Sequence, residues 1–291
     1  MTSALVRLLR PHQYIKNGFV LLGLVFSPQR SPKLFVAAAV AFVAFCLAAS
    51  SIYVLNDIMD LPSDRQHPTK CKRPIASGEI SVALASWVSA ALALGALAVG
   101  AWAGLPAAGF IAVYLLLNLA YSLRYKHVVL VDVFIIASGF MLRILVGTVG
   151  IGIAPSRWLL LTGLMLTLFL GFAKRRAELL TLQSAPDRDK ASVRRVLGDY
   201  SPALLDQLTG ITAACAILSY GLYTVDPQTV ARHHTYALFY SLPFVIYGVF
   251  RYLYLLHHRS GGGDTARDLV TDRHLILTAV LWLGVTMAVL R

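Results

Sequence analysis

Residues 53–78 read YVLNDIMDLPSDRQHPTKCKRPIASG, and this stretch begins inside an apolar run that covers residues 33–56. The run is longer than the roughly 20 apolar residues that a helix needs to cross a bilayer core of about 30 Å. Directly after it, Asp57, Asp60 and Asp64 stand beside several lysines and arginines. The stretch therefore predicts a membrane-spanning helix that leads into a charged segment at the membrane surface.

The rest of the chain is equally apolar. Of its 291 residues 57% are hydrophobic and only 14% are charged, whereas an average soluble domain has roughly 25% charged residues. We expect an all-α, polytopic membrane helical bundle of about nine transmembrane helices, forming a single domain over residues 1–291. The first candidate is the weakest, and it could instead be an interfacial or re-entrant helix. The candidates cover residues 13–28, 33–56, 81–102, 105–124, 128–150, 157–181, 203–224, 235–256 and 273–290.

The positive charges favour one side of the membrane. With a cytoplasmic N-terminus, nineteen lysines and arginines lie in or beside the cytoplasmic loops, and only Arg30, Lys33, Arg157 and Arg232 lie on the other side. This bias predicts the orientation through the positive-inside rule. The net charge of +12 is then concentrated on the cytoplasmic face, where it can bind anionic lipid or an anionic substrate.

The N-terminus lacks the apolar core and cleavage site of a signal peptide. Its first sixteen residues predict a short amphipathic helix on the membrane surface, ended by Pro11. The three cysteines are isolated, so we assign them no disulfide, metal or catalytic role.

The aspartates of the opening stretch have helical spacing. On a continuous helix the three carboxylates share one face with Asn56 nearby, although Pro62 favours a helix end near Leu61. At the C-terminal end of a helix the macrodipole disfavours acids, so a cation must compensate. Oxygen ligands of this kind suit Mg²⁺, which is commonly bridged to substrate phosphates. The alternative is a solvated, salt-bridged loop. The proposed metal ligands, of which the aspartates are also the catalytic candidates, are Asn56, Asp57, Asp60 and Asp64.

The basic residues that follow complement such a site. Lys70 and Arg73 stand beside the acids, where cations can bind a diphosphate. Their alternative role is that of ordinary positive-inside anchors.

This stretch resembles the first aspartate-rich motif, Asn-Asp-x-x-Asp-x-x-x-Asp, of the UbiA-type intramembrane prenyltransferase superfamily. The resemblance runs from RPHQYIKN at residues 10–17 to the last apolar segment. It implies a nine-helix bundle that binds a Mg²⁺-diphosphate substrate at its cytoplasmic mouth. It also implies a lateral groove, open to lipid, for a polyprenyl chain.

The sixth apolar segment departs from the usual aromatic prenyltransferases of that superfamily, which carry a second aspartate-rich motif after it. Here AKRRAEL at residues 173–179 is basic. An acid cluster with a basic cluster suits a metal-bound diphosphate and a second, bare phosphate. Together with YSLRYKHVVLVD at 121–132 and IASGFMLR at 136–143, the pattern is similar to the decaprenyl-phosphate phosphoribosyltransferases.

Further residues are candidates for phosphate contacts. An arginine within a membrane span is costly and normally faces a polar cavity or a partner, which makes Arg143 informative. Lys16 and Asn17 begin the first segment, and Tyr121 precedes a turn that contains Lys126. For the donor's phosphates we select Lys70, Arg73, Lys126, Lys174 and Arg175. For the acceptor lipid phosphate or a polar cavity we select Lys16, Asn17, Tyr121 and Arg143.

Four acidic residues stay open between two roles. Asp132 can cap a helix or pair with Lys126, or it can bind metal or ribose. Glu178 has the i,i+4 spacing of a simple pair with Lys174. The segment GDTARDLVTDRHLIL at 263–277 resembles the same subfamily, although Thr265 stands where that subfamily commonly has proline, which leaves the role of Asp264 open. The uncertain site residues are Asp132, Glu178, Asp264 and Asp272.

The resemblance implies a Mg²⁺-dependent transfer of the 5-phosphoribosyl group from 5-phosphoribosyl 1-diphosphate to a polyprenyl phosphate. The product would be a precursor of the arabinose donor for the cell envelope. The enzyme would lie in the plasma (inner) membrane with its active site on the cytoplasmic face and bind no nucleic acid. The resemblance is also compatible with a homo-oligomer. The alternatives are a prenyl-diphosphate transferase with an aromatic acceptor, and a non-catalytic protein that binds or translocates polyprenyl phosphate.

Overall fold

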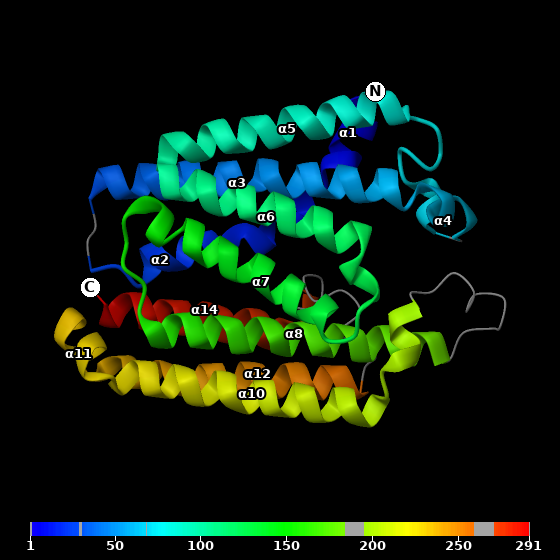
Figure 1. The fold of residues 1–291 in the computed structure, drawn as a ribbon. Helices are drawn as coiled ribbons and strands as arrows, with labels where there is room; N and C mark the ends of the chain where they lie inside the picture. The colour runs from blue at the N-terminus through cyan, green and yellow to red at the C-terminus, as the bar shows by residue number, and fades with distance from the viewer. Residues whose placement is uncertain (1, 29–30, 68, 184–194, 259–270, 291) are drawn as a thin grey trace. The chain divides into compact units, whose positions relative to one another are not determined.

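Every regular element of the described chain is a helix. The structure is a computed structural model that describes residues 2–28, 31–67, 69–183, 195–258 and 271–290 (Figure 1). Within these described ranges, seven segments are long and apolar enough to cross a membrane. The expected all-α, multi-pass architecture is therefore confirmed. The seven are Pro32–Met59, Val82–Ala103, Leu105–Leu123, Val131–Ile151, Arg157–Gln183, Pro202–Val225 and Ala237–His258.

The two outer segments of the expected nine differ from the other seven. The last is helix α14, Arg273–Val289, which is apolar but only 17 residues long. The first is a 3₁₀ helix, η1, over Pro11–Leu21, which continues into one turn of α-helix, α2, over Leu22–Val25. The structure does not confirm the count of nine, which stays a prediction.

The chain divides into two compact units. Unit 1 consists of Met1–Leu24, Arg30–Val128 and Leu142–Ala154, and unit 2 consists of Val25–Gln29, Val129–Met141 and Pro155–Arg291. Helix α7, Val131–Val146, contributes to both units. The chain forms two compact units, so the single transferase domain over residues 1–291 stays a prediction.

Unit 1 is built on three long helices. In it α3 (Pro32–Met59) packs against α5 (Val82–Ala103) and α6 (Leu105–Leu123). Many of its buried residues are alanines, which let helix backbones approach closely in a membrane protein. Helix α1, Thr2–Leu9, forms where the sequence predicts a short helix. Its Leu8 is buried against Val54 and Ile75, so protein covers the apolar side of this helix.

The charged stretch begins where α3 breaks. Helix α3 ends at Met59, Asp60 lies between two helices, and α4 (Leu61–Gln66) begins with Pro62 in its first turn. A proline is tolerated there because the first backbone N–H groups of a helix have no intrahelical partner. The expected helix end is confirmed to within two residues. The single turn η2, Lys70–Lys72, follows, and η3, Tyr125–His127, follows α6.

The segment η1 is held by a close backbone contact. A Cβ atom at Gly147, just after α7, would lie 1.7 Å from the carbonyl oxygen of Val20. Only glycine fits at this position, so the sequence allows η1 to pack directly on the end of α7. The turn η4, Val149–Ile151, follows in the same unit.

Unit 2 contains four long helices. They are α8 (Arg157–Gln183), α10 (Pro202–Val225), α12 (Leu242–His258) and α14. Short elements connect them, namely η5 (Arg195–Asp199), α11 (Pro227–His233) and η6 (Ala237–Ser241). A Cβ atom at Gly171 would lie 2.7 Å from Val133 Cγ1, so the start of α7 packs tightly on α8. This contact brings the first turn of α7 beside the charged end of α8.

Candidate active site

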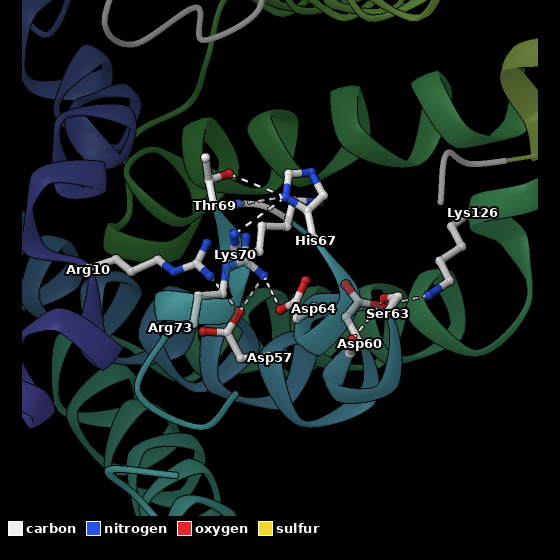
Figure 2. A network of polar contacts seen from close by, with 10 residues as sticks. All are labelled: Arg10, Asp57, Asp60, Ser63, Asp64, His67, Thr69, Lys70, Arg73 and Lys126. Atoms are coloured by element: carbon white, nitrogen blue, oxygen red, sulfur yellow. Dashed lines mark hydrogen bonds and ion pairs between the residues drawn. The ribbon is translucent and has the colours of Figure 1, made fainter. Parts of the chain in front are cut away.

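Two aspartates of the charged stretch meet at one arginine (Figure 2). The Arg73 Nη1 atom lies 2.9 Å from Asp57 Oδ1 and 2.6 Å from Asp64 Oδ2. Arg10 donates a second hydrogen bond to Asp57 Oδ1 at 2.5 Å. The two acids lie in α3 and α4 and the two arginines lie in loops, so four segments of the chain meet at this point.

The acids of this pair are buried and the bases are not. The side chains of Asp57 and Asp64 are 2–3% exposed, whereas those of Arg10 and Arg73 are 23% and 27% exposed. Buried carboxylates need a cation, because desolvation of an unpaired charge costs several kcal/mol. One guanidinium nitrogen satisfies both acids and therefore marks a position where two carboxylate oxygens converge on a cation.

This arrangement fits a divalent cation. The two convergent carboxylates, with an amide at Asn56 and a third carboxylate at Asp60 on the same segment, are oxygen ligands of the kind that Mg²⁺ prefers. Within the described part of the chain, no three His, Cys, Asp or Glu side chains lie close enough together to hold a metal by themselves. Any metal held here would therefore take its other ligands from amides, water or substrate.

Asp60 takes a different partner from the other two aspartates. Its Oδ1 atom lies 3.0 Å from Lys126 Nζ, and its side chain is 36% exposed. Asn56 accepts a hydrogen bond of 2.5 Å from the hydroxyl of Ser122. The expectation that all three carboxylates share one helix face is thus corrected, because the backbone leaves the helical path at Asp60.

Arg10 is a site residue that the sequence reasoning missed. It lies just before η1 with a positive φ of 53°, and its guanidinium stands over the ring of Tyr53 at 5.4 Å. The motif RPHQYIKN contains it, but no local spacing links residue 10 to residue 57. Lys70, by contrast, is exposed beside His67 and Thr69.

Arg143 is buried in an aromatic setting within unit 1. Its Nε donates to Asn17 Oδ1 at 2.9 Å, and its guanidinium lies over the rings of Phe45 and Tyr114 at 4.7 and 5.2 Å. Asn17 in turn donates to the Cys46 sulfur at 3.2 Å. The expected partner for an intramembrane arginine is thus present in the protein, and this contact ties η1 to α7. Lys16 and Tyr121 are half-buried.

A second charged cluster lies in unit 2. Arg175 Nε and Asp132 Oδ2 form an ion pair at 2.8 Å, and Arg175 Nη1 also pairs with Glu178. The Tyr200 hydroxyl donates to Asp132 Oδ1 at 2.8 Å and accepts from the backbone N–H of Leu130 at 2.7 Å. The structure therefore assigns Asp132 a buried arginine rather than Lys126 as its partner, because Gly171 lets α7 approach α8 closely.

The members of this cluster differ in exposure. The side chains of Arg175 and Asp132 are 1% and 0% exposed, whereas those of Lys174 and Glu178 are 39% and 29% exposed. Lys174 Nζ lies 3.9 Å from Glu178 Oε1, which confirms the i,i+4 pair. Burial raises the pKa of Tyr200, so its phenol stays protonated. Tyr200 was not among the predicted site residues, since it follows Arg175 by 25 positions without a motif.

The remaining acidic candidates have separate places. Asp272 accepts from the Leu275 backbone N–H at the start of α14 and pairs with Arg251 at 2.8 Å. It therefore acts as a helix cap in this structure. Asp264 lies outside the described residues.

Comparison with known proteins gives relatives over almost the whole chain. A protein of Corynebacterium glutamicum named decaprenyl-phosphate phosphoribosyltransferase is 33% identical, over 97% of this chain and 85% of its own length. A protein of the same name from Mycolicibacterium smegmatis is 35% identical, over 98% of this chain and 91% of its own length.

A solved structure shares the fold. The structure of a UbiA homolog from Archaeoglobus fulgidus bound to GPP and Mg²⁺ aligns with a TM-score of 0.74, at 17% identity, over 99% of both chains. The sequence profile of the UbiA prenyltransferase family matches residues 18–270. These residues include the aspartate pair of unit 1 and the charged cluster of unit 2, and the chain belongs to the UbiA prenyltransferase family.

Proposed function

We propose that this protein transfers the 5-phosphoribosyl group from 5-phosphoribosyl 1-diphosphate to a decaprenyl-type polyprenyl phosphate and releases diphosphate. We infer the substrates from the 32–35% identity, over 97–98% of the chain, to proteins named decaprenyl-phosphate phosphoribosyltransferase. The convergent pair Asp57 and Asp64 supports the diphosphate half of the reaction.

The first part of the proposal concerns the metal. Asp57 and Asp64, with Asn56 and Asp60 near them, would hold Mg²⁺. When bound, Mg²⁺ supplies positive charge that stabilises a diphosphate leaving group. Related UbiA structures that contain Mg²⁺ support the use of a divalent metal in this family.

The second part concerns the cations of unit 1. Arg10 and Arg73 are partly exposed, so their guanidinium groups can turn from the buried acids to an incoming phosphate. Lys126 and Lys70 add charge at the same end of α3 and α6. These four side chains would bind and orient the diphosphate of the donor.

The acceptor needs little further activation. A polyprenyl monophosphate is already ionised at neutral pH, so its oxygen can attack the ribose C1 without a general base. Direct attack would invert the configuration at C1. We assign Lys16, Asn17, Tyr121 and Arg143 to the acceptor side, where Arg143 donates to Asn17 and both side chains are buried.

The cellular setting is part of the proposal. The seven apolar helices make the chain a multi-pass membrane protein. The excess of positive charge on one side favours the plasma membrane with a cytoplasmic active site. The product would supply arabinose-donor synthesis for the cell envelope, residues 1–291 would act as one domain, and a homo-oligomer would be the assembled form.

The test is diphosphate release by the purified protein with Mg²⁺, 5-phosphoribosyl 1-diphosphate and a polyprenyl phosphate. Variants Asp60→Asn and Asp64→Asn are compared with Glu79→Gln, an acid that pairs with Arg7 away from the cluster. We expect release that needs the lipid phosphate, falls in both cluster variants and persists in the control.

Other outcomes would replace the proposal. Release only from a prenyl diphosphate with an aromatic acceptor would make the protein a prenyltransferase in the strict sense. Binding of polyprenyl phosphate without release from either donor would make it a binding or translocating protein.

A further inference from the structure

His67 lies in the loop that joins the buried acids of unit 1 to the basic residues after them, and the proposed reaction has so far given it no role. It follows α4 directly, and its backbone N–H donates to the carbonyl oxygen of Asp64 at 3.2 Å. Its own carbonyl oxygen accepts from the backbone N–H of Cys71 at 3.2 Å. The main chain therefore holds residue 67 close to one acid of the buried pair (Figure 2).

The imidazole ring of His67 closes a turn of this loop. The backbone N–H of Thr69 donates to His67 Nδ1 at 3.2 Å, and the backbone nitrogen of Lys70 lies 3.4 Å from the same atom. The Thr69 hydroxyl lies 3.3 Å from it. A ring nitrogen that accepts from backbone N–H groups carries no proton itself, so in the neutral ring the proton is on Nε2.

The Nε2 atom of His67 is left as a hydrogen-bond donor. Among the described residues it has no hydrogen-bond partner, and His67 is half-buried. This atom lies on the far side of the ring from Nδ1, so it points away from the turn that holds the ring. The ring is therefore fixed by one nitrogen and offers the N–H group of the other to a ligand.

The groups around this N–H favour an anionic ligand. Lys70 and Arg73 follow on the same loop and bring two positive charges (Figure 2). The Nε2–H group donates and has no free lone pair, which suits a phosphate oxygen. Hydrogen bonds to an ionised acceptor are also roughly twice as strong as those between neutral groups.

We propose that His67 binds the diphosphate of the donor, with its Nε2–H group donating to a phosphate oxygen. The inference rests on the proposed function, which places this diphosphate on the cations of unit 1, and it deepens that function by adding a neutral donor. Every residue that it uses belongs to unit 1. An N–H group of fixed direction orients a phosphate oxygen, whereas a lysine acts on it mainly as a point charge.

The experiment separates the two ring nitrogens with two substitutions. In His67→Asn the side-chain oxygen takes roughly the place of Nδ1 and accepts from the N–H two residues on, as asparagine does in turns, but the Nε2 donor is lost. In His67→Gln an amide N–H group reaches roughly the place of Nε2, and the acceptor of the turn is lost. The control is His258→Asn, the same exchange at an exposed histidine that ends α12 in unit 2.

The full chain in detergent is used to measure the affinity for inorganic diphosphate with Mg²⁺, by calorimetry, and the melting temperature. His67→Asn should weaken the affinity by about tenfold, as expected for a lost hydrogen bond to a charged group, and should keep the melting temperature. His67→Gln should keep most of the affinity and lower the melting temperature. His258→Asn should leave the affinity unchanged. In His67→Asn the KM for 5-phosphoribosyl 1-diphosphate should rise, and that for the polyprenyl phosphate should not.

Three results would overturn the inference. If His67→Asn keeps the full affinity for diphosphate, the imidazole only closes the turn. If His67→Gln loses as much affinity as His67→Asn does, the ring acts through the shape of the loop. If His67→Asn raises the KM for the polyprenyl phosphate alone, the N–H group serves the acceptor. The proposed function is judged separately, because inorganic diphosphate tests His67 whichever donor the enzyme uses.

Discussion

The acid pair of unit 1 and the charged cluster of unit 2 use the same residue types in opposite ways. In unit 1 the aspartates are buried and their arginines are about a quarter exposed. In unit 2 the central arginine and aspartate are both buried, and the exposed members are Lys174 and Glu178. Exposed cations can exchange a protein acid for a ligand, whereas a closed ion pair mainly holds other groups in place.

The difference has an energetic reason. An arginine that keeps contact with water can leave its buried carboxylate for a ligand if another cation takes its place beside the acid. A fully buried pair cannot separate without exposing two desolvated charges. The first arrangement suits binding and release at each turnover, and the second suits a fixed geometry.

The largest effect should come from breaking the buried pair. Asp132→Asn leaves Arg175 without its charge partner, and we expect the free energy of unfolding to fall by about 3–5 kcal/mol. Thermal unfolding in detergent measures this, with Asp206→Asn as the control. An equal loss in both variants would show that the buried Asp132–Arg175 pair stabilises the fold no more than the exposed Asp206–Arg176 pair does.

Asp64→Asn should lower activity more than stability. In this variant Asp57 keeps its hydrogen bonds from Arg10 and Arg73, so we expect the fold to remain stable. The rate of diphosphate release should fall by about 100-fold, because charge stabilisation of the leaving group is lost. In a titration with Mg²⁺, Asp64→Asn should need a higher Mg²⁺ concentration to reach half of its maximal rate than Glu79→Gln does. Unchanged metal dependence would remove Asp64 from the proposed metal site.

Lys126→Met tests an accessible pair. The side chains of Lys126 and Asp60 are 21% and 36% exposed, so stability should change by less than about 1 kcal/mol. The KM for 5-phosphoribosyl 1-diphosphate should rise by about threefold to tenfold if Lys126 binds a donor phosphate, with kcat less affected. Steady-state kinetics at fixed Mg²⁺ would measure this, and an unchanged KM would assign Lys126 to the pair alone.

The smallest effect concerns pH and the pair of Asp272 with Arg251. The hydrogen bond from Arg251 lowers the pKa of Asp272 from 3.8 to about 2. Because the folded pKa is below the unfolded one, the stabilisation is complete above about pH 4 and disappears as the pH falls through 2. The difference in melting temperature between the unaltered protein and Asp272→Asn should therefore shrink between pH 5 and pH 2. A difference that stays constant over this range would rule out the linkage.

Local patterns predicted the helices well. The apolar runs are long compared with a bilayer-spanning helix, so seven of nine segments appear as expected. The segment around residues 11–25 was uncertain in the sequence because it is short and contains Lys16. Its 3₁₀ form depends on contacts of Asn17 with Arg143 and of Val20 with Gly147, which are far away in the chain.

The site could be predicted only in part. Asp57, Asp64 and Arg73 lie within 17 consecutive residues, so their spacing in a motif was visible. Arg10 and Tyr200 were missed because their partners are 47 and 68 positions away. The prediction that all three aspartates share one helix face was wrong, because α3 ends before Asp60 and a new helix begins after it.

By itself, the sequence determined the membrane-embedded all-helical class and the family motif, and it predicted the side of the membrane on which positive charge collects. These properties follow from hydrophobic length and from residue types at short spacing, which the solvent acts on directly. Only the tertiary structure decided which charge faces which, and which of them water can reach. Partner and burial depend on backbone approaches between distant segments, such as Gly171 on Val133, and no local pattern encodes those distances.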